Sequence, residues 1–133
     1  MKLLDTTFLI HYWAGRDAVR EYLEAHETEA FVTTVLNIKE IAVGRAAQNK
    51  LDPVEIRTKF DWTTIVPFRL EHAFIAGELE SELQQDESVN QDEINSLTAD
   101  VLIAAVAKER GATVVTRNTD DFQQFDGVAA EAY

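Results

Sequence analysis

Three carboxylates stand where an acid is costly in this 133-residue sequence. Asp5 interrupts the apolar stretch MKLLDTTFLI, Glu40 interrupts apolar positions in TTVLNIKEIAVG, and Asp100 precedes the apolar run VLIAAVA. Burying an ionised carboxylate costs several kcal/mol unless a cation, a metal ion or hydrogen bonds compensate it. Three such acids brought together would suit Mg²⁺ or Mn²⁺, which prefer oxygen ligands.

Each of these acids also has an ordinary structural explanation. Asp5 could cap the helix that follows it, Asp100 could be stabilised by the dipole of its own helix, and Glu40 could be a helix-surface residue. On a helical wheel, however, Glu40 falls among apolar positions. The polar strip of that helix is expected to comprise Asn37, Gly44 and Gln48. The functional hypothesis therefore depends on the three acids converging in the fold.

Convergence of these carboxylates would itself indicate a cation. Two like charges 4 Å apart repel by about 4 kcal/mol at an effective dielectric of about 20. A bound divalent ion reverses the sign of that interaction, so a cluster of acids is best explained by a metal site.

The rest of the sequence predicts alternating strands and helices. Strands are predicted at residues 2–5, 29–34, 63–67, 112–116 and, at an edge, 128–133. Helices are predicted from residue 6, at 17–26, at 33–50, from 53, at 70–85 and at 96–111. The start at Pro53 follows the cap signature of Asp52, and the last of these helices is expected to begin at a Ser96 cap and stop at Gly111. The polar stretch QDESVNQDE is expected to be a loop.

This alternation predicts an α/β fold, a three-layer α/β/α sandwich with a central, mainly parallel sheet. Ligand sites in such sheets lie at the carboxyl ends of the strands. Asp5 is expected at one such end, and Thr116, Arg117 and Asn118 at another. The length suits a single domain over residues 1–133.

The charge balance is strongly acidic, with 24 Asp and Glu against 12 Lys and Arg and a net charge of −12. A field of that sign repels phosphate backbones and counts against a nucleic-acid partner. The acids are spread along the chain, which favours a solvated surface of the kind found in proteins from high-salt cells. Cysteine is absent, and the first apolar stretch is too short for a signal peptide or membrane span, so we expect a cytoplasmic protein.

Four segments together resemble the PIN-domain family and, within it, the VapC-type toxin ribonucleases of bacteria and archaea. They are LLDTTFLI, TTVLNIKEIAVG, ADVLIAAVA and VVTRNTDDF. In that order they carry Asp5, Glu40, Asp100 and, in the last segment, Thr116, Asn118, Asp121 and Phe122. The resemblance covers essentially the whole chain.

The resemblance implies a metal-dependent endoribonuclease that hydrolyses RNA phosphodiester bonds, forms a homodimer and is restrained by a cognate antitoxin. It implies Asp5, Glu40, Asp100 and Asp121 as catalytic residues, with Asp5 and Asp100 as ligands of Mg²⁺ or Mn²⁺. Thr116 would orient an acid through its hydroxyl. Many members carry a fourth acid where this chain has Asn118. Either Asn118 or the nearby Asp121 is then the fourth site residue, and Asp121 is expected to match the motif.

Two other functions fit the sequence less well. A PIN-like scaffold that binds a partner without catalysis is favoured only by Asn118. An aspartate-dependent phosphatase requires a second acid two residues after Asp5, where Thr7 stands.

The basic and aromatic residues give weaker indications. RNA would reach the acids through basic side chains, and the unranked candidates are Arg16, Arg45, Arg69 and Arg117. His11, His26 and His72 show no metal-ligand spacing and are expected to be surface or half-buried residues. Trp13 and Trp62 are expected to pack against other residues and not to stack on bases.

Overall fold

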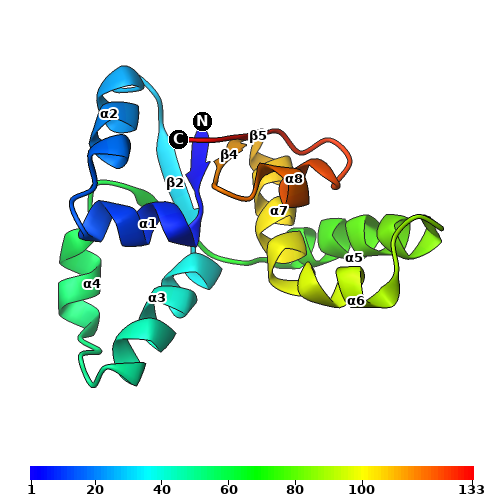
Figure 1. Cartoon of the computed structure of the whole chain (residues 1–133), viewed down its shortest axis with the longest axis horizontal. Helices are drawn as coiled ribbons and strands as arrows, with labels where there is room; N and C mark the ends of the chain where they lie inside the picture. Colours follow the sequence, from blue (N-terminus) through cyan, green and yellow to red (C-terminus); the bar gives the residue numbers. More distant parts are fainter.

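Five parallel strands form the centre of the protein in a computed structural model that describes residues 1–133 (Figure 1). The strands are β1 (Lys2–Leu4), β2 (Phe31–Thr34), β3 (Thr64–Val66), β4 (Thr113–Val115) and β5 (Ala130–Glu131). Their order across the sheet is β3-β2-β1-β4-β5, and every neighbouring pair is parallel. All five carboxyl ends therefore lie at one edge, with β1 and β4 side by side where the strand order reverses.

Eight helices cover the two faces of this sheet. They are α1 (Thr6–Trp13), α2 (Asp17–Ala25), α3 (Val35–Ala47), α4 (Pro53–Lys59), α5 (Leu70–Gln85), α6 (Gln91–Ser96), α7 (Thr98–Arg110) and α8 (Thr119–Gln123). In Figure 1, α1, α2 and α4 lie on one side of the strands and α5 to α8 on the other. The predicted three-layer α/β/α architecture is confirmed. None of the eight helices combines the length and apolar character that a membrane span requires.

The sheet separates two apolar cores because successive side chains of a strand point to opposite faces. Leu3 and Val114 belong to the core beneath α5 and α7, whereas Leu4 and Val115 belong to the core beneath α1 and α2. Neighbouring residues of β1 thus anchor both layers, which fixes the position of the residue that follows them, Asp5.

Several predicted helix boundaries follow from capping chemistry. Asp52 accepts hydrogen bonds from the backbone N–H groups of Val54 and Glu55, so α4 begins at Pro53 as expected. Gly111 ends α7 with a φ of 65°, a left-handed conformation that glycine adopts without strain.

The segment after α5 corrects two expectations. The stretch predicted as a loop includes the first half of α6, because the Asn90 side chain accepts from the N–H of Glu93 at 2.9 Å and Ile94 is buried. Ser96 is not the N-cap of α7. It ends α6 and donates its hydroxyl to the carbonyl of Glu93, and α7 follows Leu97 without a side-chain cap.

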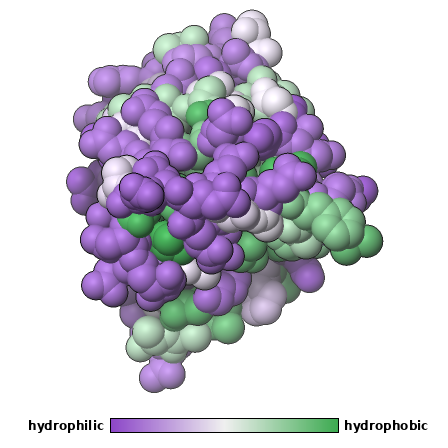
Figure 2. All heavy atoms as spheres, turned by 90° about the vertical axis from the view of Figure 1, so that its right-hand side faces the viewer, coloured by the Kyte–Doolittle hydropathy of each residue, from purple (hydrophilic) through white to green (hydrophobic).

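The face that carries α5, α6 and α8 is largely hydrophilic (Figure 2). Exposed acids on this side include Glu78, Glu82, Asp86, Glu87, Asp92 and Glu93. Much of the acid excess therefore lies on solvated helix surface, and Leu70 and Phe74 of α5 are the large apolar side chains exposed among these helices.

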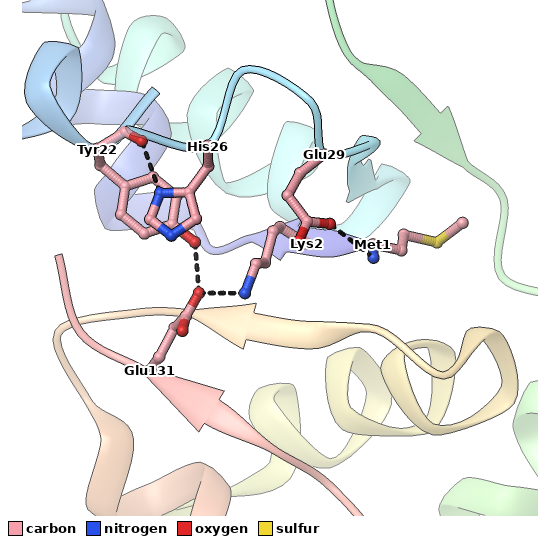
Figure 3. Close-up of polar contacts among 6 residues, drawn as sticks. All are labelled: Met1, Lys2, Tyr22, His26, Glu29 and Glu131. Carbon is pink, nitrogen blue, oxygen red and sulfur yellow. Dashed lines mark hydrogen bonds and ion pairs between the residues drawn. The ribbon is translucent and has the colours of Figure 1, made fainter. Parts of the chain in front are cut away.

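A polar cluster ties the edge strand β5 to the opposite layer (Figure 3). The Lys2 Nζ lies 2.6 Å from Oε1 of Glu131, and the hydroxyl of Tyr22 donates to the same oxygen. The Tyr22 ring stacks on His26 at a centroid distance of 4.0 Å. Although burial acts in the opposite direction, hydrogen bonds from Lys2 and Tyr22 lower the pKa of Glu131. The charge of this acid is therefore neutralised within the fold.

Candidate active site

Asp5 directly follows β1 and is 6% exposed. Its Oδ1 accepts from the backbone N–H of Thr6 at 2.9 Å and from the Asn37 amide at 3.2 Å, and its Oδ2 accepts from the Thr116 hydroxyl at 2.8 Å. Asp5 thus caps α1, as the structural explanation predicted. Burial nevertheless raises the pKa of Asp5 against these hydrogen bonds, and the charge of Glu40 adds to the rise.

A hydrogen-bond network behind Asp5 was missed by sequence reasoning. Asn37 is fully buried, so its expected place on a polar helix strip is wrong. Its carbonyl oxygen accepts from the hydroxyl of Thr34 at 2.6 Å, while its amide donates to Asp5 and to the Thr6 hydroxyl, the latter at 3.0 Å. The available signal was the spacing of Thr34 and Asn37, a capping box that opens α3.

Glu40 lies one turn further along α3 and is half-buried. Its Oε2 accepts from the Thr6 hydroxyl at 2.5 Å, so Thr6 links the second acid to the network that holds the first. Two grooves border Glu40. One, of about 290 Å³, is lined by Trp13 and Arg45, and the other, of about 510 Å³, by Lys39 and residues of α6 and α7. Glu40 therefore faces a ligand-accessible surface.

Asp100 lies in the first turn of α7 and is half-buried. Burial raises its pKa to about 7, and the negative charges of Asp5, Asp121 and Glu40 add to that rise. These interactions place all four predicted acids in one electrostatic neighbourhood. None of the ion pairs of the structure, counted to 4.0 Å, involves any of the four.

The segment after β4 resolves the relation of Asn118 to Asp121. Thr116 is fully buried, and its Oγ1 donates to Asp5 while accepting from the backbone N–H of Asn118 at 3.0 Å. The side chain of Asn118 is exposed and forms no hydrogen bond with the acids. Asp121 lies in α8, a helix that was not predicted, and its charge acts on Asp100. Of the two residues, Asp121 is the one whose charge acts on the cluster, which favours it as the fourth site residue.

Known proteins share the sequence pattern and the fold of this chain. The sequence profile of the PIN domain matches residues 2–128. The chain belongs to the PIN domain family. No curated protein sequence matches it. Among solved structures, VapBC2 from Rickettsia felis, bound to a DNA fragment from its promoter, superimposes with a TM-score of 0.81 at 22% identity, covering 99% of this chain and 98% of that one.

Two further structures resemble this PIN domain. FitAcB from Neisseria gonorrhoeae has a TM-score of 0.73 at 26% identity, over 98% of this chain and 96% of that one. A toxin–antitoxin complex from Klebsiella pneumoniae has a TM-score of 0.72 at 23% identity, over 97% and 96% of the two chains.

A second group of possible metal ligands lies elsewhere in this PIN domain. Ligand atoms of Glu71, His72 and Glu109 fall within 4.8 Å of one another. His72 is 1% exposed, so its expected surface or half-buried position is wrong. Its Nδ1 accepts from the backbone N–H of Arg69 at 2.9 Å, and its Nε2 faces Glu109 at 3.3 Å. Both ring nitrogens are engaged, so His72 serves to begin α5.

The remaining residues singled out from the sequence take structural places. His11 and His26 are half-buried, and Trp13 and Trp62 pack against the core beneath α1 and α2. The Arg45 guanidinium lies 4.6 Å from the Trp13 ring centroid and pairs with Glu55 at 2.7 Å.

The carboxylate cluster of this PIN domain fits a hard divalent cation. Every candidate ligand is a carboxylate oxygen, the donor type that Mg²⁺ and Mn²⁺ prefer. The raised pKa values of Asp5 and Asp100 show that the protein itself does not compensate the charges. A cation bound among these acids would offset the free-energy cost of burying their charges and would reduce the repulsion between them.

Proposed function

We propose that this PIN domain is a metal-dependent endoribonuclease that hydrolyses RNA phosphodiester bonds. The observation that carries the proposal is the convergence of four acids, none of them paired with a basic side chain, at the carboxyl edge of a parallel sheet. Burial, together with the charges of the other three acids, raises the pKa of Asp100 to about 7. Glu131, by contrast, is paired with Lys2.

Each residue has a distinct part in this proposal. Asp5 and Asp100 would hold Mg²⁺ or Mn²⁺, with Glu40 and Asp121 completing the catalytic set. Such an ion, when bound, supplies charge stabilisation for a phosphodiester under attack by water. Thr116 fixes the orientation of Asp5 through a 2.8 Å hydrogen bond. Asn37 and Thr6 link the carboxylates of Asp5 and Glu40 through hydrogen bonds and so fix their relative positions.

The same proposal includes an antitoxin partner and a homodimer. Structures that resemble this chain include the Klebsiella pneumoniae toxin–antitoxin complex, which supports a toxin restrained by a cognate protein. We place its activity in the cytoplasm, where cellular RNA is available. A neighbouring reading frame for a small DNA-binding protein would support the pairing.

The decisive experiment is to express the chain without a partner and map RNA ends. Cleavage is expected with Mg²⁺ or Mn²⁺ and not with a chelator, at both low and high salt. Asp5→Asn is the matched inactive control. RNA ends that are identical for the wild type and this variant would reject the nuclease and favour a PIN-like scaffold that binds without cutting.

A further inference from the structure

Tyr133 contacts three residues beside the carboxylate cluster. Its ring packs edge-on against Phe8 of α1, with centroids 4.8 Å apart. Its hydroxyl lies 2.8 Å from Nδ1 of His11, and the guanidinium carbon of Arg117 lies 4.3 Å from its ring centroid. The aromatic ring thus holds an otherwise flexible arginine at a defined place.

Two positive charges converge on this place. Burial lowers the pKa of His11, and the charges of Arg16 and Arg117 lower it further. The lowered pKa of His11 disfavours a positive charge on its ring, and its Nδ1 shares a hydrogen bond with the Tyr133 hydroxyl. Both arginines are exposed, and neither takes part in an ion pair.

Arg117 lies close to the acids. Arg117 directly follows Thr116, whose hydroxyl donates to Asp5 at 2.8 Å. Burial raises the pKa of the Tyr133 hydroxyl, the charge of Asp5 adds to the rise, and Arg117 and Arg16 oppose it. The charges of Asp5, Arg117 and Arg16 therefore all act on the Tyr133 hydroxyl.

This geometry separates the four arginines that the sequence left unranked. Arg45 is committed to Glu55. Arg69 precedes α5, next to the buried His72. The guanidinium of Arg117 lies over an aromatic face, and Arg117 forms no ion pair within the chain, so the guanidinium can offer N–H groups to a phosphate.

We infer that Arg117 forms a subsite for a backbone phosphate of the substrate RNA, next to the phosphate that the acids cleave, and that Arg16 adds positive charge to this side of the molecule. Tyr133 is a positioning residue that aligns Arg117. This inference rests on the proposed nuclease function. It explains how a chain of net charge −12 attracts RNA to one point of its surface.

The test measures RNA binding in an Asp5→Asn background, which prevents cleavage. The affinity of a short single-stranded RNA is followed by fluorescence anisotropy over a range of salt concentrations. Arg117→Ala is expected to weaken binding about tenfold and to reduce the slope of log K against log salt by about 0.7, the loss of one phosphate contact. Arg110→Ala, an exposed arginine at the far end of α7, is the matched control and should change neither quantity.

A double-mutant cycle tests the role of Tyr133. Tyr133→Leu should weaken RNA binding when Arg117 is present and have no further effect when Arg117 is already alanine. Equal effects in both backgrounds would mean that Tyr133 does not act through Arg117.

The two levels of the proposal fail differently. Normal RNA binding by Asp5→Asn with an unchanged salt slope in Arg117→Ala would overturn the subsite alone. No RNA binding by folded Asp5→Asn, together with no cleavage by the wild type, would overturn the nuclease function and the subsite with it.

Discussion

An acid on the edge strand and the acids of the carboxylate cluster lie in opposite electrostatic surroundings. Glu131 on β5 receives Lys2 and Tyr22, and its pKa lies below the usual value although burial alone would raise it. Asp100 receives no cation, and burial with three neighbouring acids raises its pKa to about 7. Glu131 completes its charge balance within the chain, whereas the proposed site would draw on a cation from outside. The difference separates an acid that holds the fold together from the acids of the proposed metal site.

The largest expected effect comes from Asp5→Asn. Cleavage of RNA should fall by about 100-fold or more, because the variant loses a carboxylate charge at the buried centre of the cluster. The metal-free fold should be as stable as the wild type or more so, since an asparagine can still cap α1 and repulsion is relieved. RNA cleavage assays and urea unfolding measure the two quantities.

Glu131→Gln serves as the control for this first prediction, because it alters the paired acid and should cleave RNA at the wild-type rate. Retained cleavage by Asp5→Asn combined with a clear loss of metal-free stability would place Asp5 with the structural acids.

The second prediction concerns metal binding. Mg²⁺ at 100 times its Kd should stabilise the wild type by about 2.7 kcal/mol, and the rise in Tm should be much smaller for Asp100→Asn. Glu109→Gln, which alters the other group of possible ligands around His72, should respond like the wild type. Thermal unfolding with and without Mg²⁺ provides the comparison, and equal shifts for wild type and Asp100→Asn would mean that the acids do not form one site.

The third prediction concerns pH. The pKa of Asp100 is about 7 in the folded protein against 3.8 ordinarily, so between these values the folded state binds a proton that the unfolded state releases. The metal-free protein should therefore gain stability as the pH falls from 8 toward 5. At pH 8, Asp100→Asn should be more stable than the wild type by about 1–2 kcal/mol, a figure that allows for solvent screening of a half-exposed group.

Urea unfolding between pH 5 and 8 checks this third prediction. The wild-type curve should slope and the Asp100→Asn curve should be flatter. Parallel curves for the two proteins would show that the pKa of Asp100 is not raised in the folded state.

The smallest effect is expected for the paired acid. Glu131→Gln should lower the free energy of unfolding at pH 7 by about 1 kcal/mol, because it removes the partner of Lys2. The pKa of Glu131 is lowered in the fold. The stabilisation that its charge gives the folded state is therefore present above about pH 4.5 and is lost as the pH falls below that value. Urea unfolding at pH 7 and pH 3 measures the difference.

Glu29→Gln, which alters an exposed pair with the N-terminal amine, is the matched control and should change stability by less than about 0.5 kcal/mol. If Glu131→Gln were equally silent, the lowered pKa of Glu131 would have no consequence for folding.

Local signals explain what the sequence could predict. The parallel α/β fold followed from the alternation of apolar runs, and Asp5 and Asp100 stood out because they interrupt or begin such runs. Capping residues such as Asp52 act on neighbours within three positions, so the boundary at Pro53 was also predictable.

Contacts between distant segments explain what was missed. Asn37 is polar and helical, and its buried amide donates a hydrogen bond to Asp5, 32 positions away. His72 is buried by its position against Glu109, 37 positions away. The short helix α6 lies in a stretch so polar that the single buried side chain of Ile94 gave no recognisable period.

The hydrogen bond from Thr116 to Asp5 spans 111 positions of the chain. A ribosome that has synthesised β1, α1 and α3 has produced Asp5 and Glu40, but the strand that carries Thr116 and the helix that carries Asp121 are still missing. The proposed activity can therefore arise only after nearly the whole chain has emerged and β4 has docked beside β1. Under the proposed function, this sequence separation delays RNA cleavage until synthesis of the chain is nearly complete.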